Sequence, residues 1–144
     1  MIGKALYTSN TDEWSTPQDV FDKLDREFGF TLDAAASKDN AKCKRYFDKE
    51  ADGLKQSWAG ETVWCNPPYG RQIGAWMKKA LAESRNPDTT VVMLVHARTD
   101  TNWFHSFVYH RAEIRFLRGR LRFGGAKNNA PFPSMIVIYR GPET

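Results

Sequence analysis

Asn66-Pro67-Pro68-Tyr69 combine an amide, a fixed backbone and an aromatic ring directly after the apolar run 62–65. The two prolines restrict the backbone, so these groups are expected to be held rigidly at the end of a strand. The Asn66 side-chain oxygen can accept one N–H of an exocyclic amino group, and the Pro67 carbonyl can accept the other. The Tyr69 ring can lie against the face of the flat ring that carries this amine, or it could simply cap a core. The tetrad therefore predicts a site for a planar amine, although Asn-Pro-Pro also forms ordinary turns.

Predicted elements on either side place the tetrad in a loop between a strand and a helix. Residues 62–65, Thr-Val-Trp-Cys, have the composition of a strand. From Gln72 to Ser84, apolar side chains recur at helical spacing, at Ile73, Trp76, Met77, Ala80 and Leu81. Open α/β sheets carry their chemistry where strands end. This context favours a functional loop over a plain turn.

The rest of the chain alternates predicted helices and strands. One helix is expected to begin with Thr16 as its N-cap and Pro17 as its first residue, and to end at Gly29. A second is expected over 101–109. Predicted strands are 30–33, 46–47, 62–65, 91–95, 114–117, 121–123 and 135–139. The last two are joined by a Gly/Asn/Pro-rich loop, which predicts an α/β fold with a small Rossmann-like sheet that ends in an antiparallel β hairpin.

Length and composition indicate one domain. A chain of 144 residues with 41% hydrophobic residues can bury one core. The polar, turn-rich residues 8–12 predict a flexible N-terminal arm over 1–12, followed by a single domain over 13–144. We expect a soluble cytoplasmic protein with no membrane partner, because no apolar run is long enough to span a bilayer and the N-terminus lacks a secretion-signal pattern.

Charge and metal-binding patterns narrow the possible partners. The net charge of +4 and the pI near 9.1 weakly favour a polyanion such as nucleic acid. Cys43 and Cys65 stand far apart, and the three histidines, His96, His105 and His110, show no ligand spacing with them. Neither a disulfide framework nor a metal site is therefore expected.

Two aspartates are candidates for contact with a cofactor. Asp33 ends a predicted strand, and the alanines that follow it would let a ligand approach the backbone, while its carboxylate could balance a positive charge. An Asp followed by three alanines is also an ordinary helix start. Asp52 lies in an Asp-Gly-Leu turn, where it could bind a ribose or an adenine amino group or could only shape the turn.

Three arginines near the C-terminal end alternate with apolar residues. In an extended segment Arg118, Arg120 and Arg122 would share one face, while Leu121 and Phe123 would face the core. This arrangement predicts contacts with DNA phosphates, and a solvated strand face is the alternative.

Two more residues are expected near the site predicted at the tetrad. Phe132, between two prolines, is a rigidly presented aromatic that could stack on a flipped base or fill the core. His96 ends the predicted central strand and could be no more than a polar strand end.

The tetrad is similar to the catalytic motif of S-adenosylmethionine (SAM) dependent N6-adenine methyltransferases, and nearly the whole chain resembles the phage-type DNA N-6-adenine methyltransferase family. The segments that carry the resemblance are, in order, Trp14-Ser15-Thr16-Pro17, Phe28-Gly29-Phe30, Leu32-Asp33-Ala34-Ala35, Tyr46-Phe47, Asp52-Gly53-Leu54, Trp64-Cys65-Asn66-Pro67-Pro68-Tyr69 and Pro131-Phe132-Pro133-Ser134. The resemblance implies an enzyme that uses SAM to methylate the exocyclic N6 of adenine in DNA. If the protein is phage-encoded, the host cytoplasm is its expected location, and a homodimer is an arrangement that the sequence allows.

The resemblance also implies roles for individual residues. Catalytic roles fall on Asn66, Pro67, Pro68 and Tyr69, and cofactor-binding roles fall on Trp14, Thr16, Pro17, Asp33, Ala34 and Asp52. The chain departs from the wider methyltransferase pattern, because residues 34–37 replace the usual Gly-rich loop and only about thirty residues separate Asp33 from Asn66. One strand-helix unit is therefore expected to be missing, which would make cofactor binding shallower and more dependent on Trp14 or a partner subunit.

Two alternative functions fit the same residues. One is methylation of another planar amine or amide, in a protein glutamine, in RNA adenine or at cytosine N4. The other is a non-catalytic nucleic-acid-binding module that has lost the cofactor.

Overall fold

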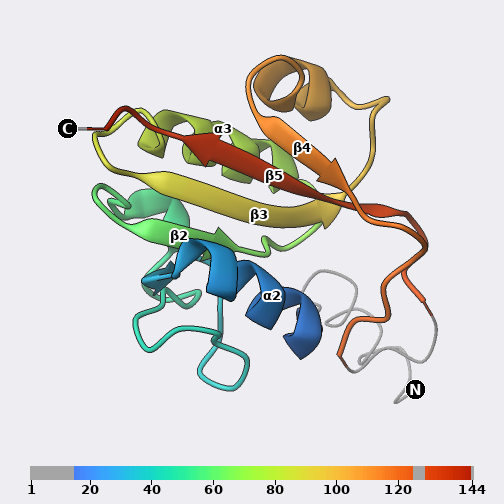
Figure 1. Ribbon diagram of the computed structural model, residues 1–144, viewed down its shortest axis with the longest axis horizontal. Helices are drawn as coiled ribbons and strands as arrows, with labels where there is room; N and C mark the ends of the chain where they lie inside the picture. Colours follow the sequence, from blue (N-terminus) through green and yellow to red (C-terminus); the bar gives the residue numbers. More distant parts are fainter. Residues whose placement is uncertain (1–14, 125–128, 144) are drawn as a thin grey trace.

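The computed structural model describes residues 15–124 and 129–143, which form a mixed α/β fold around an open five-stranded sheet (Figure 1). The strands lie side by side in the order β1-β2-β3-β5-β4. The first three are parallel to one another, and β5 runs antiparallel to both of its neighbours, β3 and β4. Their bounds are β1 Leu32–Asp33, β2 Thr62–Cys65, β3 Thr90–His96, β4 Glu113–Phe116 and β5 Ser134–Arg140.

The two faces of the sheet bury separate hydrophobic cores. The central strand β3 alternates between them, so Val91, Met93 and Val95 point into one core while Val92 and Leu94 point into the other. Helix α3 (Ile73–Glu83) covers the first core and α2 (Gln18–Phe28) covers the second, as their positions on opposite sides of the sheet show (Figure 1). Because both of its faces are covered, β3 is apolar along nearly its whole length.

Several predicted elements are confirmed. Strand β2 has the predicted bounds, and α3 and β3 differ from the predicted ranges by one residue at each end. Gly29 ends α2 in the left-handed conformation, with a φ of 71°. The predicted cap of α2 is wrong, because Pro17 occupies the N-cap position without a side-chain cap and Thr16 uses its hydroxyl elsewhere.

Other predicted elements are shorter than expected. The strand predicted over 30–33 is reduced to β1, and Tyr46 pairs with Asp33 only through an isolated bridge. Within 101–109 the helix is dominated by one π-helical turn, η2 (Phe104–Val108). No helix follows Asp33, so the alternative reading of that aspartate as a helix start is excluded.

The predicted strand over 121–123 is absent, and the final hairpin predicted with 135–139 is not formed by these residues. The physical reason lies in β5, whose two edges are already hydrogen-bonded to β3 and β4. Residues 121–123 therefore have no edge of β5 left to pair with, and Gly119 turns the chain before them at a φ of 73°.

Two predictions involve residues that the structure does not describe. The N-terminal arm over 1–12 and the candidate cofactor residue Trp14 both lie outside the described ranges. Within those ranges, no helix is long and apolar enough to cross a membrane.

Candidate active site

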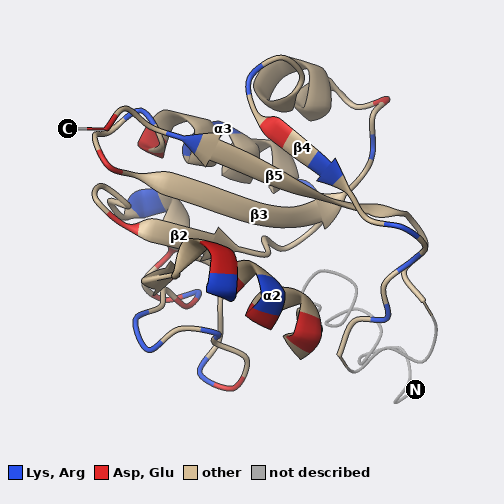
Figure 2. Cartoon of the chain, in the orientation of Figure 1, with Lys and Arg blue, Asp and Glu red and all other residues tan. Residues whose placement is uncertain are grey.

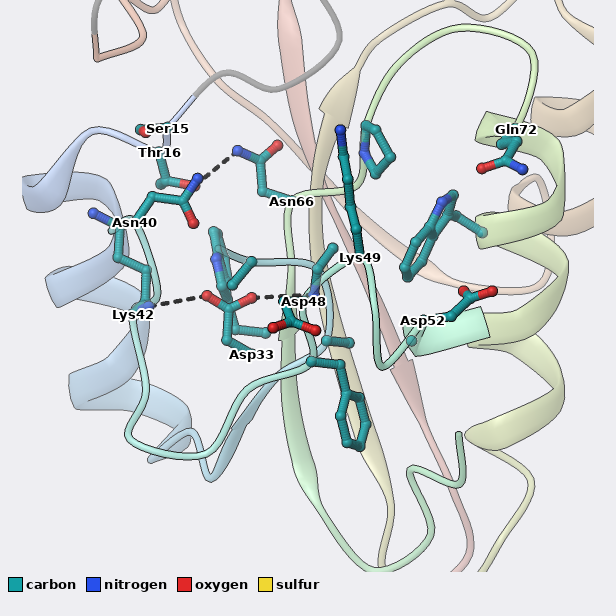
Figure 3. A pocket seen from close by; sticks show the side chains of 18 residues that line it. Ser15, Thr16, Asp33, Asn40, Lys42, Asp48, Lys49, Asp52, Asn66 and Gln72 are labelled. Atoms are coloured by element: carbon teal, nitrogen blue, oxygen red, sulfur yellow. Dashed lines mark hydrogen bonds between the residues drawn. The ribbon is translucent and has the colours of Figure 1, made fainter. Parts of the chain in front are cut away.

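A cavity of about 260 Å³ opens at the carboxyl ends of β1 and β2. Its walls come from the segment before α2, the end of β1 with the alanines after it, the polar loop 40–49, the turn at Asp52, the end of β2 with the tetrad, and the start of α3. Figure 3 shows Thr16 and Asn40 on one side of this cavity, Asp52 and Gln72 on the other, and Asp33 and Asn66 between them. The cavity thus lies where open α/β sheets carry ligands.

Asn66 lies in the wall of the cavity, and its amide is oriented by Thr16. The Asn66 Nδ2 donates a hydrogen bond to the Thr16 Oγ1 at 3.0 Å. Thr16 is only 5% exposed, so this contact is shielded from water. With Nδ2 turned toward Thr16, Oδ1 points the other way (Figure 3), which is the orientation an amine acceptor needs.

Tyr69 is held on the other side of the tetrad, against β3. Its ring stacks on the His96 ring with centroids 3.9 Å apart and planes within 5°. The Tyr69 hydroxyl donates to the Leu94 carbonyl at 3.4 Å, and burial raises the pKa of this phenol, so the ring stays neutral. Asn66 and Pro68 line the cavity, whereas Pro67 and Tyr69 do not. Asn66 and Pro68 therefore border the cavity, whereas the Tyr69 ring packs against β3.

Asp33 is buried, at 3% exposure, and its carboxylate shapes the loop that follows β1. Oδ2 accepts the Lys42 backbone N–H at 2.9 Å, and Oδ1 accepts that of Ala35 at 3.3 Å. Burial raises the pKa of Asp33 to about 6, against the opposing effect of these N–H donors. Ala34 is also buried beside it, and its N–H donates to the Trp64 carbonyl at 3.0 Å.

Asp52 lines the opposite wall and shapes its own turn. It has a φ of 59°, and its Oδ1 accepts the Leu54 backbone N–H at 3.1 Å, capping the short helix η1 (Gly53–Lys55). The turn packs closely on the rest of the cavity, since a Cβ built on Gly53 would lie 2.2 Å from the Ala34 carbonyl oxygen. Of the two roles predicted for Asp52, the turn-shaping one is present, and its place in the wall is consistent with the other.

Only some of the remaining residues predicted to bind the cofactor lie in the cavity wall. Thr16 and Ala34 line the cavity, but Pro17 does not. Sequence reasoning missed two further wall segments, the polar loop with Lys42 and Lys49 and the helix residue Trp76. Trp76 was assigned to the buried stripe of its helix, and its spacing gave no sign that the same ring also borders a cavity.

The three arginines predicted to contact DNA lie on the loop that follows β4, and basic residues are spread along this loop (Figure 2). The inference of one strand face is wrong, because residues 118–122 are not a strand. All three arginines are nevertheless exposed, and Phe123 is buried as expected. Arg120 donates to the Pro131 carbonyl at 2.7 Å, which ties the loop to the segment around Phe132.

Phe132 is half-buried and packs on His96 and Arg98, which lie at and just after the end of β3. Its ring centroid lies 5.2 Å from that of His96, and the Arg98 guanidinium lies 4.5 Å from the Phe132 centroid. Phe132 therefore contacts His96 directly and Tyr69 only through it.

Most of the chain is similar to known proteins. The profile of the family described as DNA N-6-adenine-methyltransferase (Dam) matches residues 3–143. The DNA N-6-adenine-methyltransferase of Haemophilus phage HP1 is 31% identical over 139 residues, which cover 91% of this chain and 80% of that protein. The protein of the same name from Escherichia phage T1 is 37% identical over 112 residues, or 76% of this chain.

The match to the phage T1 protein covers 46% of its length, so this chain spans about half of that relative. The family profile, in contrast, covers nearly the whole chain, and the segments quoted above from the sequence fall inside the matched range. The chain therefore belongs to the DNA N-6-adenine-methyltransferase family.

Proposed function

We propose that the chain transfers a methyl group from SAM to the exocyclic N6 of adenine in DNA. The observation that carries this proposal is the Asn66 amide, held by Thr16 at 3.0 Å in the wall of the cavity with its oxygen turned away from that bond. Family membership supports the same reaction.

The cavity has the chemical groups that SAM requires. SAM supplies a methyl group on a positively charged sulfonium and carries an adenosine and an amino-acid moiety. The carboxylates of Asp33, Asp48 and Asp52 line the cavity and suit the positive charges and hydroxyls. Lys49 suits a carboxylate. The flat Trp76 ring suits an adenine, and its buried Nε1 has no hydrogen-bond partner among the described residues.

The tetrad residues would act on the amine by orienting it. Asn66 Oδ1 and the Pro67 carbonyl each accept one N–H of the adenine amino group, which raises the electron density on nitrogen and aims its lone pair. Tyr69 stacks on the base, which must leave the duplex to reach it. The reaction would be a direct displacement, in which the N6 lone pair bonds to the methyl carbon as the bond from that carbon to the SAM sulfur breaks. S-adenosylhomocysteine would leave, and the methylated amine would release one proton to solvent, so no covalent enzyme intermediate is needed.

Further features complete the proposal. We assign DNA contacts to Arg118, Arg120, Arg122 and Phe132, and we take the sheet to be a reduced Rossmann-like one. A homodimer and action in the host cytoplasm are also proposed, the latter because the HP1 and T1 relatives are phage proteins.

Product identification tests this function. The purified protein is incubated with SAM labelled on its methyl group and with adenine-containing DNA, and the digested nucleosides are separated. Label in N6-methyladenine is expected. Label only in N4-methylcytosine, in RNA or in protein glutamine would support another acceptor, and DNA binding without label transfer would support a binding module.

A further inference from the structure

His96 is the last residue of β3, and it is buried, with 6% exposure. Its backbone is fixed by pairing with Ser134 of β5, and the next residue, Ala97, donates its N–H to the Pro133 carbonyl at 2.7 Å. The imidazole therefore projects from a part of the sheet that has little freedom to move.

Three rings from distant parts of the sequence meet at this point. We call Tyr69, His96 and Phe132 the aromatic column. The His96 ring lies between the other two, parallel to Tyr69 at 3.9 Å and tilted by 49° against Phe132 at 5.2 Å. The Arg98 guanidinium covers Phe132 at 4.5 Å, which extends the column toward the surface.

Strand β3 restrains Tyr69 in two ways. His96 covers one face of the ring, and the Leu94 carbonyl accepts the hydroxyl at 3.4 Å. Rotation of the ring about its own axis would break the parallel stack, since the two planes differ by only 5°. An aliphatic side chain could fill the same space, but it would not supply a flat surface that sets the plane of Tyr69.

The imidazole is uncharged at neutral pH. Burial, with a smaller effect from the Arg98 charge, lowers the pKa of His96 to about 4. A neutral ring can lie flat on Tyr69 without carrying an ionic group into the core.

We propose that His96 is a positioning residue for Tyr69: it fixes the plane of the Tyr69 ring before the flipped adenine arrives to stack on that ring. This inference rests on the proposed adenine methylation. A ring fixed before DNA arrives costs less ordering on binding, so His96 would act on capture of the base and not on the methyl transfer itself.

The kinetic test compares His96→Ala with His96→Phe, which restores a flat ring. With adenine-containing DNA, His96→Ala is expected to raise KM for DNA about tenfold, as for the loss of one base–aromatic stack, with kcat within about threefold of the parent. His96→Phe is expected to restore KM to within about threefold. His105→Ala is a matched control, because it removes an exposed imidazole that contacts a different tyrosine, Tyr109.

A second measurement does not depend on catalysis. In protein with 13C-labelled tyrosine rings, NMR line shapes report how fast the Tyr69 ring flips. Slow flipping is expected in the parent and in His96→Phe, and fast flipping in His96→Ala. All variants are first checked for the parent thermal unfolding profile.

The outcomes separate the two claims. If the parent transfers no methyl group to adenine, the proposed function is wrong, and the ring-flip comparison still decides whether His96 fixes Tyr69. If the parent is active, a folded His96→Ala protein with parental KM and parental ring flipping overturns the role of His96. A His96→Phe protein as impaired as His96→Ala overturns it too, because a flat ring would then not be what matters.

Discussion

At the scale of single residues, the hydrogen bond from Asn66 Nδ2 to Thr16 Oγ1 orients the amide so that its oxygen faces an incoming amine. The sequence predicted Asn66 as an acceptor from the chemistry of its side chain alone. It could not predict the partner, because Thr16 precedes it by fifty positions in the chain. The Thr-Pro pair was interpreted as a helix cap, which is its commonest local use. Tertiary contact with the tetrad overrides that preference.

The bond between Thr16 and Asn66 is testable by removing only the hydroxyl. Thr16→Val keeps the shape of the side chain but lets the amide rotate, so kcat is expected to fall about tenfold, the equivalent of roughly one hydrogen bond. Thr16→Ser retains the hydroxyl and should keep most of the activity. Steady-state kinetics at saturating SAM measure both. Equal rates for Thr16→Val and the parent would show that the amide is oriented by something else.

Asp33 predicts a pH dependence of cofactor affinity. Its pKa is raised to about 6 in the free protein, and only the ionised carboxylate attracts the positive sulfonium. SAM affinity should therefore weaken as pH falls from 7 to 5, by up to about tenfold at one unit below this pKa. Calorimetry across this range measures it, with Asp33→Asn as the variant that should show no such slope. If SAM affinity of the parent did not change with pH, Asp33 would not balance the charge of the sulfonium.

The raised pKa of Asp33 also affects the folding stability of the protein without SAM, and this effect has the opposite pH dependence. The pKa of Asp33 is 3.8 in the unfolded chain and about 6 in the folded one. Between these two pH values, the folded state binds a proton at Asp33 that the unfolded chain does not. Through this group, folding stability rises as pH falls across that window. Thermal unfolding of the parent and Asp33→Asn, compared without SAM, isolates this contribution.

At the scale of elements, the parallel strands β2 and β3 could be predicted from the sequence, whereas the structure of residues 121–123 could not. Strand β3 is apolar because both of its faces are covered, and this signal is local to the strand. Whether 121–123 could join the sheet depended on β5, whose edges are taken by β3 and β4. Alternation of arginines with apolar residues predicted exposure and burial correctly, because an extended loop against a core alternates in the same way.

The contact between η1 and the β1 loop sets the width of the cavity. A Cβ at Gly53 would lie 2.2 Å from the Ala34 carbonyl oxygen and 3.0 Å from the Trp76 ring. Gly53→Ala should push these walls apart, cost about 1–3 kcal/mol of stability and weaken SAM binding at least tenfold.

Gly74→Ala is the matched control for this substitution. Its Cβ would meet only the Trp103 Cβ, at an ordinary 3.7 Å, inside helix α3. It should leave SAM affinity unchanged and stabilise the protein by about 0.5–1 kcal/mol. Denaturant unfolding and calorimetry measure both variants. Gly53→Ala protein that binds SAM like the parent would mean that the walls of the cavity are not rigid.

The loop after β4 predicts a salt-dependent contact with DNA. Replacing Arg118, Arg120 and Arg122 together with Gln should flatten the slope of log K against log salt by about two to three units, if each contacts one phosphate. SAM affinity should not change. The control variant replaces Lys78, Arg85 and Arg111 with Gln, because these exposed residues carry the same charge and none of them lines the cavity. If the two triple variants showed the same salt slope, Arg118, Arg120 and Arg122 would contribute to DNA binding no more than other basic residues on the surface.

At the scale of the whole molecule, the family could be predicted, because it depends on short segments in a fixed order. The cavity lies at the strand ends where the candidate site was expected. The predicted loss of one strand-helix unit is consistent with the two-residue β1 and the irregular chain between β1 and β2. The composition of the cavity could not be predicted, since its walls combine six segments that meet only in the folded chain. The aromatic column shows the same limit, because Tyr69, His96 and Phe132 carry no mutual spacing signal.

The central claim is that Asn66 grips the target amine during methyl transfer. The most direct measurement is the single-turnover rate of adenine methylation at saturating SAM and DNA, for the parent and for Asn66→Ala. The two prolines that follow keep the loop in place, so the variant should remain folded and bind SAM within about threefold of the parent. Its rate should fall by about a hundredfold or more, as when one oriented polar group is removed from a reacting centre. A folded, SAM-binding Asn66→Ala protein that methylates adenine at the parental rate would contradict the account.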